Sequence, residues 1–263
     1  MWLIAYALTG AFVGFLAGLL GIGGGMTLVP VFSAMFQAQS LSADHTVHLA
    51  LATAMASVVF TSSSSVLAHH RLGSVDWSIV RRMAPGMVAG SLLSTLAAGW
   101  MSQRVLALGF ALIVYGGATQ MLLGRKPTPG RTLPGPLPMN ALGLLIGVIC
   151  GLVSAGGAFL TVPLMLAWGV TMRMAIGTAA AVGVPVAVVG MVGYVISGWQ
   201  VPNLPAYTLG FVYVPALLAV VAASVLTAPY GARLAHRMPV ATMKRVFALL
   251  LYLLATKMIV TYW

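Results

Sequence analysis

Two glycine-rich clusters stand at matching places in the sequence, and their residue types are suited to binding an anion. The first is Gly21-Ile-Gly-Gly-Gly25 and the second is Ser154-Ala-Gly-Gly-Ala158. A glycine costs about 1 kcal/mol relative to alanine inside a helix, so each cluster is expected to interrupt the helix that contains it. A helix that restarts after such a break presents free N–H groups and the positive end of its dipole. A small anion is therefore the expected ligand.

Hydroxyl side chains near the clusters extend this candidate site. Ser154 and Thr161 bring hydroxyls that the first cluster partly lacks, so the two breaks should contribute unequally. Thr53 and Thr178 occupy matching positions at the start of the following helices and could complete the pocket from two sides. Ser57 follows one turn after Thr53, and for this hydroxyl packing within the helix is the alternative explanation. The expected substrate-binding residues are Gly21, Gly23, Gly24, Gly25, Met26, Thr27, Thr53, Ser57, Ser154, Gly156, Gly157, Ala158, Thr161 and Thr178.

Residues for catalysis or metal binding are missing from the pattern. The chain contains no Glu, and its two Asp residues, Asp44 and Asp76, fall at the ends of apolar segments. Cys150 is the single cysteine, which excludes an intrachain disulfide and a cysteine-based metal cluster. An intramembrane enzyme would need paired carboxylates or a Ser-His pair at membrane depth. We therefore expect no catalytic residues, no cofactor and no metal.

The elements that must position these residues are membrane-spanning helices. The chain is 60% hydrophobic and 6% charged, with a mean hydropathy of +1.04. A helix needs about 20 apolar residues to cross a bilayer. Eight apolar stretches are long enough: 3–36, 46–68, 79–99, 104–123, 140–169, 174–196, 207–228 and 241–261. The net charge of +11 comes from Lys and Arg scattered between these stretches, which favours topology signals over nucleic-acid binding.

An internal repeat organises the chain. A shift of 133 positions lays Gly14–Leu19 over Gly147–Leu152, and a similar shift lays Phe110–Met121 over Phe247–Met258. The expected units are a first membrane repeat at 1–125, a cytoplasmic Pro/Gly linker at 126–138 and a second membrane repeat at 139–263.

The charge distribution favours inverted repeats. If every apolar stretch crosses once, Lys and Arg divide seven to six between the two sides; if 3–36 and 140–169 are re-entrant hairpins, they divide eleven to two. Positive residues concentrate on the cytoplasmic side, so the second arrangement is preferred. Each repeat is then a broken or re-entrant helical hairpin followed by three transmembrane helices, and both termini are periplasmic. Eight simple spans in two parallel repeats is the alternative.

Two segments, one of which contains the first glycine cluster, resemble those of a known family. Gly18-Leu-Leu-Gly-Ile-Gly-Gly-Gly25, followed by Val29-Pro30, and His69-His-Arg-Leu-Gly-Ser-Val-Asp-Trp77 are similar to segments of the sulfite exporter TauE/SafE family. The resemblance implies a multi-pass transporter of the bacterial inner membrane that exports sulfite, organosulfonates or similar sulfur oxyanions. The second glycine cluster departs from the family's fuller form at Ser154, Ala155 and Ala158.

The expected partners are a small anion and the lipid bilayer, without nucleic acid, and a homo-oligomer is compatible with the sequence. The absence of a buried carboxylate favours uncoupled efflux, because the membrane potential supplies about 2.3 kcal/mol per charge per 100 mV. A carrier of another anion, such as a carboxylate, and a membrane subunit without transport activity are the alternatives.

Overall fold

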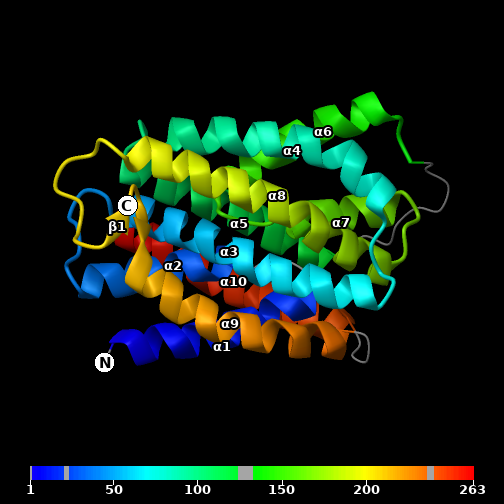
Figure 1. The fold of residues 1–263 in the computed structure, drawn as a ribbon, viewed down its shortest axis with the longest axis horizontal. Coiled ribbons are helices and arrows are strands. Elements are labelled where there is room, and N and C mark those ends of the chain that lie inside the picture. Colours follow the sequence, from blue (N-terminus) through cyan, green and yellow to red (C-terminus); the bar gives the residue numbers. More distant parts are fainter. Residues whose placement is uncertain (1, 21–23, 124–132, 236–239) are drawn as a thin grey trace.

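The first and fifth apolar stretches are each divided at their glycine-rich cluster, so the chain folds into more helices than it has apolar stretches. A computed structural model describes residues 2–20, 24–123, 133–235 and 240–263. Its helices in these ranges are α1 (Trp2–Leu20), α2 (Gly25–Ala38), α3 (Thr46–Arg71), α4 (Trp77–Ala98), α5 (Gln103–Leu123), α6 (Pro136–Leu152), α7 (Ala158–Ala167), α8 (Met172–Gly198), α9 (Val214–Ala235) and α10 (Val240–Tyr262). They form an elongated bundle (Figure 1).

The helices have the length and composition of membrane spans. Within the described residues, five are long and apolar enough to cross a bilayer: Trp2–Leu19, Thr46–Arg71, Gln103–Leu123, Met172–Gly198 and Val214–Gly231. Large apolar side chains also cover the outer surface; Ile4 is 67% exposed and Leu112 is 73% exposed. Both observations confirm the prediction of an all-α membrane protein.

Glycines bring the helices of the two halves into close contact. A Cβ added at Gly14 of α1 would lie 2.5 Å from the Cα of Ser224 in α9. A Cβ added at Gly147 of α6 would lie 2.7 Å from the Cα of Met87 in α4. Small residues permit such backbone approach between membrane helices. Gly14 and Gly147 therefore allow close helix packing, and each half contributes one helix to each pair.

The remaining long helices also pair across the halves. α3 packs against α8, and α5 packs against α10. Between α5 and α10, the Tyr115 hydroxyl bonds to Thr256 and the Tyr252 hydroxyl bonds to Thr119. The two hydrogen bonds are equivalent. In each, a tyrosine of one helix pairs with a threonine of the other, and Tyr115 and Thr119 of α5 correspond to Tyr252 and Thr256 of α10 in the internal repeat.

The two ends of the bundle hold different connections (Figure 1). The N-terminus, the C-terminus and the connections after α2 and α4 lie at one end, which we call the terminal end. The connections after α3 and α7 lie at the other. α1 and α2 together leave and return to the terminal end, whereas α6 and α7 leave and return to the opposite one.

Basic residues concentrate at the end opposite the termini, which we call the basic end. The Lys and Arg residues in helices at that end are Arg71, Arg81, Arg82, Arg173, Arg233, Lys244 and Arg245. Elsewhere in the described residues, Arg104 at the start of α5 and Lys257 near the end of α10 lie toward the terminal end.

Two boundaries differ from the expectation. The stretch 207–228 is not one span, because β1 (Thr208–Leu209) and β2 (Val212–Tyr213) form an antiparallel hairpin before α9 begins. Hydrophobicity alone did not separate these residues from the helix. α6 starts at Pro136, inside the predicted linker, since proline is well tolerated in the first helical turn. Residues 126–132 of that linker lie outside the described residues.

Candidate anion-binding site

The two helix breaks have the same backbone geometry. Gly24 precedes α2 with φ of 76°, and Gly157 precedes α7 with φ of 88°. Both values lie in the left-handed region, which glycine adopts without the steric cost that other residues incur. Neither helix start has a side-chain cap. The two glycines are 133 positions apart, which is the shift that relates the halves of the sequence.

The same hydrogen-bond pattern at both helix starts leaves the first N–H groups without a partner among the described residues. The carbonyl of Gly24 accepts the N–H groups of the third and fourth residues of α2, both at 3.1 Å. The carbonyl of Gly157 accepts the two corresponding N–H groups of α7 at 3.0 and 2.9 Å. The first two N–H groups of each helix, those of Gly25 and Met26 and of Ala158 and Phe159, have no hydrogen-bond partner among the described residues. Free N–H groups at a helix start favour an anion.

The two breaks touch each other between α3 and α8. A Cβ added at Gly25 would lie 1.7 Å from the carbonyl oxygen of Ser154, so only glycine allows this approach. Val58 of α3 contacts both breaks, with methyl carbons 3.0 Å from the added Cβ of Gly25 and 3.6 Å from that of Gly156. The carbonyl of Gly156 lies 2.9 Å from a Cβ added at Gly183 in α8.

The half-helices run outward from this meeting point. α2 leads from its break to the terminal end, and α7 leads from its break to the basic end (Figure 1). Their N-terminal ends therefore converge inside the bundle, where both helix dipoles present positive charge.

Ser154 is held in place by the protein itself. Its φ is 51°, and its hydroxyl donates to the carbonyl of Leu51 in α3 at 2.7 Å. The N–H of Ala155 donates to the carbonyl of Cys150 at 3.0 Å, which closes the end of α6 as a Schellman motif does. The hydroxyl that was expected to reach an anion thus donates its proton to the backbone in this structure.

Other hydroxyls of the expected set differ in their partners. Thr161 donates to the carbonyl of Gly157 at 3.1 Å, and Ser57 donates to the carbonyl of Thr53 at 2.8 Å. Thr27, in the first turn of α2, is 2% exposed, and its hydroxyl has no partner among the described residues. Thr27 is therefore the hydroxyl of this set that is most available to an anion.

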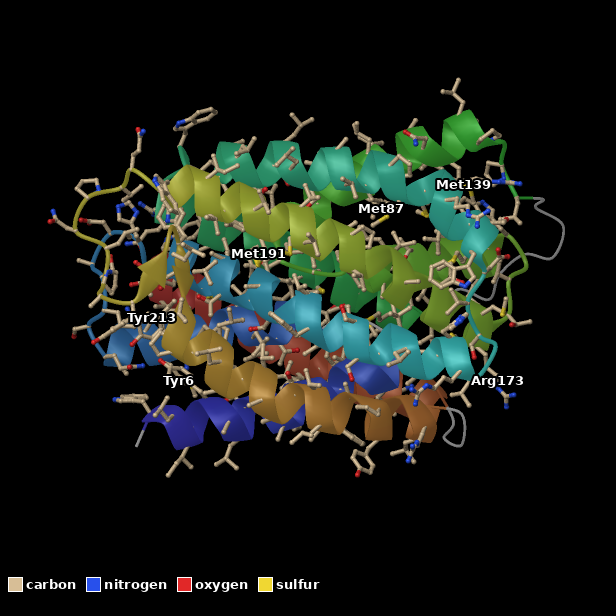
Figure 2. The ribbon with its side chains drawn as sticks, viewed as in Figure 1. Tyr6, Met87, Met139, Arg173, Met191 and Tyr213 are labelled. Carbon is tan, nitrogen blue, oxygen red and sulfur yellow. The ribbon has the colours of Figure 1, made fainter. Side chains whose placement is uncertain are left out.

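Thr53 and Thr178 are not brought together. The Thr53 hydroxyl accepts the N–H of Tyr213, and the Thr178 hydroxyl accepts the N–H of Asp76, both at 2.9 Å. Tyr213 precedes α9 at the terminal end and Asp76 precedes α4 at the basic end (Figures 1 and 2). The two threonines therefore anchor the starts of α9 and α4, and their part in anion binding stays a prediction.

The rest of the expected set lies at the breaks. Met26 and Ala158, in the first turns of α2 and α7, are buried. Gly21 and Gly23 lie outside the described residues. Val58 and Gly183 contact the breaks but were not predicted, because a single valine or glycine in an apolar helix carries no distinguishing pattern.

Comparisons with known proteins give one family and several relatives. Residues 6–258 match the model of the family described as sulfite exporter TauE/SafE. The chain is 36% identical, over 95% of its length and 96% of the relative's, to a protein of Haemophilus influenzae named "Probable membrane transporter protein". It is 25% identical, over 88% of its length and 90% of the relative's, to the "Probable membrane transporter protein YdhB" of Bacillus subtilis. No solved structure matches.

Proposed function

The chain belongs to the sulfite exporter TauE/SafE family, and relatives of it are named probable membrane transporter proteins. We propose that it carries a small anion across the membrane and that the anion binds where the two helix breaks meet. The convergence of two helix N-termini, each with two N–H groups that have no hydrogen-bond partner among the described residues, is the observation that carries this proposal. Both dipoles favour negative charge at the same point.

The surroundings of the breaks suit an anion. The chain has two acidic residues, and both lie outside the breaks: Asp76 caps the start of α4, and Asp44 lies in the connection before α3. We call the meeting point of the two breaks, at Gly24–Met26 and Ser154–Phe159, the break site. No acidic side chain of the described residues therefore lies beside the break site to repel a negative ligand. Thr27 adds a hydroxyl donor beside the N–H groups of α2.

The proposed substrates are sulfite, organosulfonates and similar sulfur oxyanions, a class suggested by the family's description. Their oxygens are compact hydrogen-bond acceptors, which match a cradle of backbone N–H groups. A carboxylate would present the same chemistry, and we keep it as the second candidate. The proposed direction is export, since a cell interior that is electrically negative drives anions outward without a coupled ion.

The proposed topology is that of inverted repeats with the basic end in the cytoplasm. α1 with α2, and α6 with α7, leave and return to opposite ends of the bundle, as two oppositely oriented hairpins would. The contacts between the two halves are also equivalent. α1 of the first half packs on α9 of the second, and α6 of the second half packs on α4 of the first. The excess of Arg and Lys at the basic end supports its cytoplasmic location and periplasmic termini.

Thermal unfolding of the purified protein tests the substrate class. Sulfite, thiosulfate, a sulfonate and a carboxylate would be added over a concentration series, because a ligand that binds the folded state raises Tm. The proposal predicts a saturable rise with at least one sulfur oxyanion. A rise with carboxylates alone would favour the second candidate, and no rise with any anion would favour a subunit without transport activity.

A further inference from the structure

One face of α3 carries polar side chains from the breaks to the basic end. Val58 contacts both breaks, and Ser62, Ser65 and His69 follow it at positions +4, +7 and +11. This spacing places all four on one face of a helix. At 1.5 Å per residue, the face extends about 16 Å beyond the breaks, which is about half of the roughly 30 Å hydrocarbon core.

Ser65 is the residue on this face whose chemistry is unexplained. It is 1% exposed, and its hydroxyl has no hydrogen-bond partner among the described residues. The neighbouring serines differ, because Ser63 donates to the carbonyl of Val59 at 2.6 Å and Ser64 donates to the carbonyl of Val225 at 3.2 Å. A buried unpaired hydroxyl is unfavourable, so Ser65 is expected to meet a polar partner that passes through or binds there.

The same face is apolar in the other direction. Toward the terminal end it carries Val47, Leu51 and Ala54, all fully buried. Polar side chains of this face therefore lead from the breaks to one end of the bundle.

Positive charge stands where the polar face ends. His69 contacts the start of α8, since a Cβ added at Gly177 would lie 3.2 Å from the His69 Cβ. Arg71 at the end of α3 is exposed, and so is Arg173 at the start of α8, which Figure 2 shows at the basic end. An anion approaching from this end would meet these charges first and the serine hydroxyls next.

We propose that Ser62, Ser65 and His69 form one wall of the route that joins the break site to the basic end, and that the Ser65 hydroxyl donates to the anion on that route. This inference rests on the proposed transport function. It adds residues that the glycine clusters do not contain, and it assigns the polar route to the basic half of the protein. Nearer the terminal end, the Ser57 hydroxyl of α3 donates to its own helix, at the carbonyl of Thr53.

A serine-to-alanine pair tests the role of the Ser65 hydroxyl. Sulfite flux in proteoliposomes would be measured for the wild type, Ser65→Ala and Ser63→Ala. A hydrogen bond to a charged group is worth about tenfold or more, so Ser65→Ala should slow flux about tenfold. Its Tm should not fall, because the Ser65 hydroxyl makes no hydrogen bond to any described residue. Ser63→Ala, which removes an exposed hydroxyl bonded to its own helix, should transport as the wild type does.

Cysteine labelling tests the route without relying on transport. In a Cys150→Ala background, Ser65→Cys should react with a negatively charged methanethiosulfonate reagent added at the basic end. Ser63→Cys should not react, because an exposed side chain at this position of the candidate span Thr46–Arg71 would face lipid. Unlabelled Ser65→Cys together with wild-type flux in Ser65→Ala would overturn the route. A fall in flux that is matched by a fall in Tm would show a structural role and would also overturn it.

The two experiments separate this inference from the proposed function. If the wild type neither carries nor binds any tested anion, the transport proposal fails, and labelling of Ser65→Cys then still decides whether this face is hydrated. If the wild type carries sulfite but Ser65→Cys is shielded and Ser65→Ala is fully active, the route fails alone.

Discussion

Gly25 shows how one residue type can decide whether the two breaks meet. Its Cα lies against the carbonyl of Ser154, where a side chain has no room. Gly116 in α5 is a contrasting glycine, because a Cβ added there would meet no atom within 4 Å. An alanine at each position therefore distinguishes two effects. At Gly25 the added methyl group is crowded by the Ser154 carbonyl, and at Gly116 only the helix preference of alanine acts.

We expect Gly25→Ala to lower the stability of the protein by about 1–3 kcal/mol, since the added methyl must displace backbone. Gly116→Ala should leave stability unchanged or raise it by up to about 1 kcal/mol. Thermal unfolding of the two variants measures the difference. Equal Tm values for both variants would contradict the contact between the breaks.

Ser154 provides a second test at this scale, because its φ of 51° is unfavourable for any residue with a side chain. Both Ser154→Ala and Ser154→Gly remove the hydrogen bond to Leu51, but only glycine relieves the backbone strain. Ser154→Gly should therefore be more stable than Ser154→Ala by about 1 kcal/mol. A higher Tm for Ser154→Ala would show that the strain is absent in solution.

At the scale of elements, Thr53 and Thr178 connect helices that are distant in sequence. Each hydroxyl accepts the backbone N–H of the residue that precedes a helix of the other half, at Tyr213 and Asp76. Their matching positions are thus explained by helix anchoring as well as by the ligand contact that the sequence suggested.

We expect Thr53→Val and Thr178→Val each to lower stability by about 1–3 kcal/mol, because each leaves a backbone N–H without its acceptor. The serine variants at the same positions keep the hydroxyl and should lose less. Thermal unfolding with and without sulfite distinguishes the two roles. An unchanged Tm combined with a weaker response to sulfite would instead assign the threonines to the ligand.

Part of this arrangement could be predicted from the sequence and part could not. Glycine clusters are local features. The division of each stretch, 3–36 and 140–169, into two helices could therefore be predicted from Gly21–Gly25 and Ser154–Ala158 alone. The contact of Val58 with both breaks depends on how α3 packs, which no local pattern encodes. The hairpin at 208–213 was missed because it and the start of α9 lie in one apolar stretch, 207–228.

Across the whole molecule, the distribution of positive charge indicates how the bundle is oriented in the membrane. The described Lys and Arg residues lie mostly at the basic end, with Arg104 and Lys257 toward the other (Figure 1). The Lys and Arg distribution in the sequence favoured re-entrant hairpins at 3–36 and 140–169. In that arrangement, residues 38 and 72 must face opposite sides of the membrane. The structure has the connection after α2 and the connection after α3 at opposite ends of the bundle.

Single cysteines in a Cys150→Ala background test this orientation. Ala43→Cys and Asn203→Cys should react with an impermeant reagent added outside cells, and Gly73→Cys should react only after the cells are opened. The positions lie in connections between helices, and a Cβ added at Gly73 meets no atom within 4 Å, so the substitutions should not disturb packing. The φ of 65° at Gly73 should cost the Gly73→Cys variant about 1–2 kcal/mol of stability. Labelling of residues 43 and 73 from one side would rule out the proposed topology.

If an anion binds where the two helix N-termini meet, a crystal structure should locate it there. Selenite has the charge and shape of sulfite, and its selenium scatters anomalously in a crystal of the protein. We expect an anomalous peak within hydrogen-bond distance of the N–H groups of Gly25 and Met26 or of Ala158 and Phe159. A peak elsewhere in the bundle, or none at a selenite concentration that raises Tm, would contradict it.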